Sequence, residues 1–167
     1  MVKRFVSLVT GLAAGVGASQ APGFTLQYMQ NLDGRVDELR LIVERFDENI
    51  ARIGYDRDQA LDECGEADPA RLLGALCDGI VADIARYETL VAHQAELTQA
   101  ADWARPAVLA RTFRRDIADS AMDRFEPAVP ATPTGAGYAA AGFAGGWGVL
   151  TVLLGLLTAP FRRREAY

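Results

Sequence analysis

The chain has 167 residues, half of them hydrophobic, and a formal net charge of −5. The charge is unevenly distributed: residues 29–137 hold 21 acidic and 12 basic side chains, whereas the two ends together hold five basic and one acidic. No basic patch with interleaved aromatic residues is present, so the composition argues against nucleic acid as a partner. One lysine against sixteen arginines, with abundant alanine and glycine, is typical of a high-GC bacterium.

An apolar segment stands at each end of the chain. Phe5–Tyr28 and Tyr138–Phe161 each reach the length of about 20 residues that a helix needs to cross a bilayer. Basic residues flank both segments on their outer sides, namely Lys3, Arg4 and Arg162–Arg164. Five basic residues on these flanks against three on the opposite flanks predict cytoplasmic termini. We therefore expect a bacterial inner-membrane protein whose central part lies in the periplasm.

The N-terminal segment has a second interpretation as a cleaved signal peptide. Lys3 and Arg4, an apolar run to Gly17 and the small residues around Ala18 fit that pattern. The apolar character resumes after Ala18 and continues to Tyr28, which favours a retained span with Tyr28 as an interfacial anchor. Pro22 predicts a kink near the far end of this helix.

A heptad pattern follows the first span. Apolar residues step alternately by four and three, which is typical of helices that pack with coiled-coil geometry: Leu32, Val36, Leu39, Val43, Phe46, Ile50 and Ile53. Asp68–Pro69 predicts the start of a second long helix. Its apolar seam has the same steps: Leu73, Cys77, Ile80, Ile84, Tyr87 and Val91. The two helices are expected to form an antiparallel hairpin that leaves the membrane and returns to it.

A third, shorter helix is predicted from Pro106 to about Phe125. Arginines gather near its start: Arg105, Arg111, Arg114 and Arg115. They either contact anionic lipid headgroups or lie in solvent on a helix packed against the hairpin. Three prolines then predict a stiff linker over residues 127–137.

Both apolar segments carry small residues at four-residue spacing. Gly142 and Gly146 form a GxxxG pattern in the second, and Gly11 and Gly15 have the same spacing in the first. Small residues let helix backbones approach closely inside a membrane. The pattern leaves open whether the two spans of one chain or the spans of different chains make the contact.

Candidate chemical sites are few. Cys64 and Cys77 are the only cysteines, and they either form a disulfide near the hairpin tip or stay as buried thiols. His93 is followed by Glu96, the reverse of the Glu-x-x-His order found in di-iron bundles, so we expect it at a polar surface or flank position and not as a metal ligand. The acidic tip fits a calcium loop poorly, because leucine stands at its glycine position. The sequence therefore predicts neither catalytic residues nor a cofactor.

The segment Gln20–Phe24, followed by Gln27 and Tyr28, resembles the first-span signature of a family of small proteobacterial inner-membrane proteins known only as a domain of unknown function. The resemblance implies the same layout of two spans around a helical middle. It implies no catalytic residues.

These patterns predict an all-α protein with five parts: a transmembrane helix (1–28), a helical extracytoplasmic domain (29–126), the linker (127–137), a second transmembrane helix (138–161) and a basic cytoplasmic tail (162–167). The expected function is that of a non-enzymatic structural or accessory protein. It would act by self-association or as a subunit of a larger membrane complex, with membrane lipids as further partners. The alternative is an oligomeric channel or transport element whose first span lines the pore.

Overall fold

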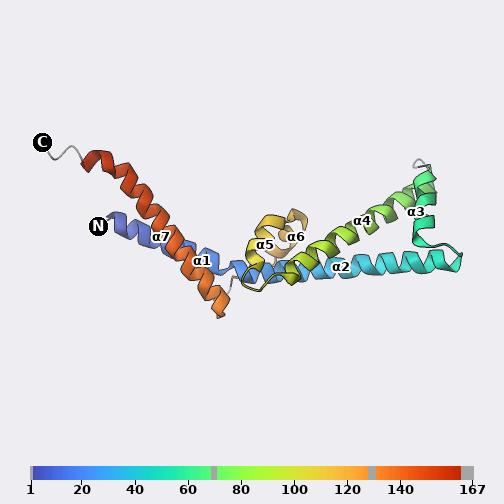
Figure 1. The fold of residues 1–167 in the computed structure, drawn as a ribbon, viewed down its shortest axis with the longest axis horizontal. Coiled ribbons are helices and arrows are strands. Elements are labelled where there is room, and N and C mark those ends of the chain that lie inside the picture. The colour runs from blue at the N-terminus through green and yellow to red at the C-terminus, as the bar shows by residue number, and fades with distance from the viewer. Residues whose placement is uncertain (1, 69–70, 128–130, 163–167) are drawn as a thin grey trace.

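The computed structural model describes residues 2–68, 71–127 and 131–162, and within these ranges every regular element is an α-helix. In chain order the helices are α1 (Val2–Ser19), α2 (Ala21–Arg52), α3 (Arg57–Glu66), α4 (Leu72–Gln99), α5 (Arg105–Thr112), α6 (Arg115–Met122) and α7 (Pro133–Arg162). The predicted all-α class is confirmed. The molecule is elongated, with α1 and α7 crossing at one end and α3 lying at the other (Figure 1).

α1 and α2 are separated only by Gln20. Pro22 has no backbone N–H and occupies the first turn of α2, where that group would lack a helical partner in any case. The N–H of Phe24 donates to the Gln20 carbonyl at 2.9 Å and so opens the α2 ladder. The irregularity predicted around Pro22 therefore lies at Gln20. Beyond it, the 32 residues of α2 extend for about 48 Å.

The turn from α2 to α3 is specified by local chemistry. Gly54 has φ +86°, a left-handed conformation that glycine adopts without a steric penalty. The N–H of Tyr55 donates to the Ile50 carbonyl at 3.0 Å and closes α2. Asp56 and Gln59 then form a reciprocal capping box that starts α3, with hydrogen bonds of 2.8 and 3.1 Å.

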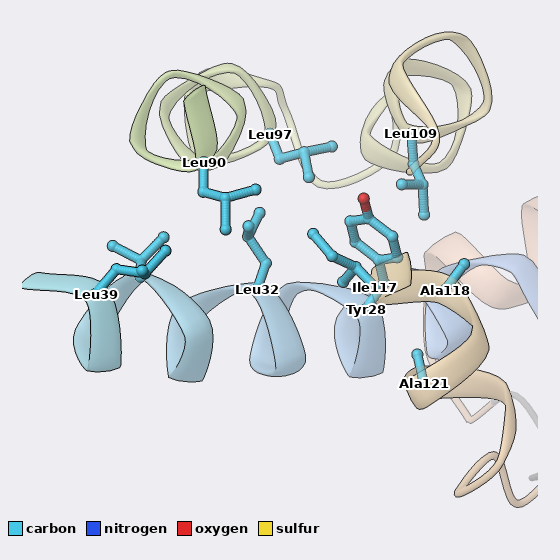
Figure 2. Packing of buried hydrophobic residues seen from close by; sticks show 10 residues of the cluster. Tyr28, Leu32, Leu39, Leu90, Leu97, Leu109, Ile117, Ala118 and Ala121 are labelled. Atoms are coloured by element: carbon cyan, nitrogen blue, oxygen red, sulfur yellow. The ribbon is translucent and has the colours of Figure 1, made fainter. Parts of the chain in front are cut away.

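The main core lies where α2, α4, α5 and α6 meet (Figure 2). Its buried members are Tyr28, Leu32, Val36 and Leu39 from α2, Leu90 and Leu97 from α4, Leu109 from α5, and Ile117, Ala118 and Ala121 from α6. The first half of the α2 heptad is thus buried. The last three positions of the seam differ from one another: Phe46 is half-buried, Ile50 is buried and Ile53 is 72% exposed.

The seam predicted for the second long helix is only partly correct. Cys77 and Ile84 are buried, but Leu73 is 67% exposed. The contact instead continues through Leu90 and Leu97, which lie on a neighbouring face of α4. A straight helix rotates relative to a strict seven-residue repeat, and α5 and α6 add a second partner surface for the later residues.

Three predicted boundaries also need correction. The third helix is two helices, because Phe113 and Arg114 interrupt it between α5 and α6. α4 begins at Leu72 with Arg71 as its N-cap, and Pro69 lies outside the described residues. The linker expected over 127–137 is shorter, since α7 begins at Pro133; residues 128–130 lie outside the described part of the chain.

Candidate interaction sites

The contact between α1 and α7 is built from small residues. On α1 every fourth residue is buried against α7: Ser7, Gly11, Gly15 and Ser19. A Cβ atom added at Gly11 would lie 2.9 Å from the Trp147 Cβ, and one added at Gly15 would lie 2.9 Å from the Ala139 carbonyl oxygen. Each distance is too short for a Cβ contact, so the close approach of the helices requires glycine at both positions.

The two glycines of the second apolar segment face the same contact. A Cβ atom at Gly142 would lie 2.5 Å from the Ala18 Cβ, and one at Gly146 would lie 2.6 Å from the Ala14 Cβ. Gly145, between them, has no atom within 4 Å of an added Cβ. All four predicted packing glycines therefore meet in one contact, and the contact lies within a single chain.

The outer faces of α1 and α7 are apolar. Large hydrophobic side chains exposed there are Phe5, Leu8, Val9, Leu12 and Val16 on α1, and Val149, Val152, Leu153, Leu156 and Leu157 on α7. By length and composition, two stretches are apolar enough to include a membrane span, Lys3–Arg52 and Pro133–Leu157. The helix pair thus has a tightly packed inner face and a hydrocarbon-like outer face.

A buried polar pair connects α2 with α4 next to this helix pair. The Tyr28 hydroxyl and Nε2 of His93 share a hydrogen bond of 2.9 Å, and the two rings meet edge to face. The tautomer of the imidazole sets whether Nε2 accepts this bond from the phenol or donates to it. The prediction of a polar surface or flank position for His93 is therefore wrong: the residue is 8% exposed and is paired with Tyr28 inside the fold.

Burial lowers the pKa of His93 below its ordinary value of about 6.5, because the charged ring would lose its hydration. Glu96 acts in the opposite direction and Arg114 adds to the lowering. Glu96, three residues away on α4, thus opposes the shift but does not reverse it. The hydrogen bond that holds His93 joins residues 65 positions apart, which no local pattern reveals.

Arginines converge on Asp116 at the start of α6. Nitrogen atoms of Arg35, Arg86 and Arg114 lie 3.5, 3.1 and 3.7 Å from its carboxylate. Arg35 also donates to the Asp116 carbonyl and to Ser120, both at 2.8 Å. This cluster joins α2, α4 and α6 outside the apolar core.

The four arginines expected either to contact lipid headgroups or to lie in solvent do not share one environment in the structure. Arg105 donates to the Leu97 carbonyl at 3.2 Å and pairs with Asp102, so it caps the end of α4. Arg114 is half-buried beside Asp116. Arg111 and Arg115 are exposed, so only these two point outward in the way that headgroup contact requires.

The far end of the molecule holds an apolar cavity of about 550 Å³ between α2, α3 and α4. Its lining includes Phe46, Ile50 and Ile53 from α2, Leu73, Leu76 and Ile80 from α4, and the disulfide between Cys64 and Cys77. We call this cavity the tip groove. α3 fully buries none of its own side chains, so the disulfide is the main link that holds it to α4.

Taken together, these features define an all-α protein with two candidate membrane helices at one end and a helical body at the other. A family model described as "Protein of unknown function (DUF2937)" matches residues 2–163, and the chain belongs to this family. The resemblance to a family of unknown function is thereby confirmed. Comparison with curated proteins and with solved structures gave no match.

Proposed function

We propose that this protein is a non-enzymatic accessory subunit of a bacterial inner-membrane complex. α1 and α7 form its membrane anchor, and α2–α6 form an antiparallel helical hairpin in the periplasm that presents the tip groove to another chain. The observation that carries the proposal is the division of apolar surface. One part covers the outer faces of α1 and α7, and the other lies beside α3. These helices lie at opposite ends of the molecule (Figure 1).

The geometry of the anchor supports a role as a single-chain unit. Its glycine contact is filled by the two helices of one chain, so these glycines are not available for a second chain. Assembly would therefore use other surfaces, and the exposed apolar side chains at the tip offer one: Ile53, Leu72, Leu73 and Leu76. Apolar groups left exposed in this way are typical of interaction sites.

Two observations support the periplasmic placement of the hairpin. The disulfide between Cys64 and Cys77 lies at the tip, and disulfides persist in the oxidising periplasm rather than in the cytosol. Lys3, Arg4 and Arg162–Arg164 would lie on the opposite, cytoplasmic side, as the positive-inside rule requires.

The channel alternative has less support from the polar residues of the first span. The residues expected to line the pore are Thr10, Ser19 and Gln20. Ser19 is buried, and its hydroxyl donates to the Val16 carbonyl at 2.7 Å, whereas Thr10 and Gln20 are half-buried. Ser19 would thus be unavailable to line a pore. Ion flux through vesicles that contain the purified protein would be measured to test this alternative, and conductance would favour it over the accessory role.

The test of the proposed function is the mass and composition of the tagged full-length protein, solubilised gently from its own membranes. Foreign chains at fixed stoichiometry would support an accessory subunit. A large particle of this chain alone would replace that role with self-assembly. An 18-kDa monomer without partners would overturn both.

A further inference from the structure

We infer that the tip groove binds an amphipathic helix of a partner protein, with an apolar face and basic flanks. The inference rests on the proposed accessory role and deepens it by naming the chemistry of the partner. It is carried by three properties of the far end: an unfilled apolar groove between two helices, its rigid frame, and the acidic charge around it.

The groove has the shape and lining that a helix recognises. α2 and α4 contact each other near the core but enclose a cavity of about 550 Å³ near α3, where their apolar residues line it from both sides. Leu73 and Leu76 are 67% and 64% exposed, and Ile53 is 72% exposed. The heptad seam of α2 thus ends at Ile53, in a region that α4 does not cover. A groove flanked by apolar helix faces is the usual receptor for one amphipathic helix.

The frame of the groove is fixed before any partner arrives. The Cys64–Cys77 disulfide holds α3 across the open end of the helix pair. The Tyr55 hydroxyl donates to Glu63 at 2.6 Å, and Arg57 pairs with Asp47, so both ends of the short connection are held in place. A preformed groove avoids part of the entropy cost of ordering a site on binding.

The charge around the groove selects the partner. Residues 44–83 carry eleven acidic and only four basic side chains. Three of these four, Arg52, Arg57 and Arg71, pair with acidic side chains of the same region, and the fourth, Arg45, lines the groove. Eleven acidic against four basic side chains leave a net charge of −7 around the groove, which attracts a basic segment and repels an acidic one.

The same charge argues against two other occupants. A second copy would bring an equally acidic tip against this one, and like charges oppose such a contact. Lipid acyl chains of the surrounding membrane would have to reach along α2, which is about 48 Å long, from the anchor at the opposite end (Figure 1).

The test uses the full-length protein in nanodiscs of zwitterionic lipid and two fluorescent helical probes of about 18 residues, five turns. One probe has a leucine face and a lysine face, and the second probe has the same sequence with glutamate in place of each lysine. Fluorescence anisotropy measures binding, with protein-free nanodiscs as the blank. Several surface ion pairs between the acidic residues around the groove and the probe would add up. We therefore expect the lysine probe to bind at least about tenfold tighter than the glutamate probe, and its affinity to fall as the salt concentration rises.

Two variants on the same helix give the matched comparison. Leu76→Asp places a charge in the groove and should reduce binding of the lysine probe by about tenfold or more. Val81→Asp adds the same charge at an exposed position outside the groove lining and should not weaken binding. Circular dichroism shows whether Leu76→Asp alters the fold. If it does, Leu76→Ala replaces it as a smaller change at the same position, with a smaller expected loss of binding.

Equal binding of both probes, or binding of neither, would overturn the inference. Light scattering provides a third readout: a dimer of the wild-type protein that Leu76→Asp dissociates would assign the groove to a second copy instead. These outcomes are independent of the complex isolated from native membranes. Failure here therefore leaves the accessory role standing, and failure of the accessory role is seen in the purified particle.

Discussion

At the residue scale, Tyr28 and His93 show how two polar side chains can be buried when they form a hydrogen bond with each other. The sole histidine has an acidic neighbour at Glu96, which suggests a solvated helix surface when read along the sequence. In the fold, α4 turns His93 toward α2, where the phenol hydroxyl satisfies its ring nitrogen. A buried polar group without such a partner would cost free energy, so the two residues stabilise each other's burial.

Replacing Tyr28 by Phe removes this hydroxyl and leaves Nε2 of His93 buried without its partner. We expect Tyr28→Phe to lower the free energy of unfolding by about 1–3 kcal/mol. Thermal and chemical unfolding of the protein in detergent, followed by circular dichroism, would measure it. Tyr87→Phe serves as the control, since its hydroxyl has no hydrogen bond within the described residues. Equal effects of the two variants would contradict the pairing.

The lowered pKa of His93 predicts a pH dependence of stability. In the unfolded chain the imidazole binds a proton near pH 6.5, whereas burial in the fold disfavours the charged form. The unfolded state therefore binds more protons than the folded state. The contribution of the buried, neutral His93 to the free energy of unfolding is complete above about pH 6.5 and is lost as the pH falls through and below that value. Between about pH 7.5 and pH 5.5, wild-type protein should lose more stability than His93→Gln. Parallel curves for the two proteins would refute this.

At the scale of elements, the anchor depends on backbone proximity rather than on large interlocking side chains. Gly142 approaches the Ala14 carbonyl so closely that an added Cβ would lie 2.6 Å from its oxygen. Gly142→Leu should therefore separate α1 from α7 and lower stability by about 1–3 kcal/mol, the usual cost of overpacking. Gly145 lies on a different face of α7, and no atom lies within 4 Å of a Cβ added there, so Gly145→Leu should leave stability nearly unchanged. The midpoint of thermal unfolding in detergent distinguishes the two variants, and equal midpoints would refute the contact.

The disulfide holds α3 in place against α4. This helix buries none of its side chains, and the 13-residue separation of Cys64 and Cys77 closes a short loop. A disulfide around a loop of about 15 residues contributes about 3 kcal/mol. We expect reductant to raise amide hydrogen exchange in α3 while exchange in α6 stays unchanged. The chain has no other cysteines, so reductant acts only there; unchanged exchange in α3 would show that other contacts hold it.

The elements that the sequence predicts well are those with a long, local pattern. The α2 seam from Leu32 to Val43 is buried as its heptad predicts, because four successive turns repeat one face. α4 is less predictable, since its later turns face α5 and α6 as well as α2. The break at Phe113 and the burial of His93 depend on these tertiary contacts, and neither leaves a periodic signal in the chain.

At the scale of the whole molecule, the separation of the tip groove from the anchor follows from the length of α2. α5 and α6 pack on α2 close to Tyr28 and thicken the body on the anchor side. Toward α3 only α2 and α4 remain, and they do not fill the space between them. Hydrophobic burial is thus concentrated near the anchor, while exposed apolar area remains where another chain could reach it.

The orientation of the whole molecule can be tested through its single lysine. Lys3 precedes the first apolar segment, so cytoplasmic termini predict that an impermeant amine reagent modifies it in inside-out vesicles but not in spheroplasts. Glu66→Lys adds an exposed lysine at the tip and should show the opposite accessibility. Mass spectrometry of the labelled peptides assigns each site and also detects Lys3 itself, which a cleaved signal peptide would remove. Modification of Lys3 in spheroplasts would place the termini outside the cytoplasm, and the tip groove would then have to find its basic partner in the cytosol.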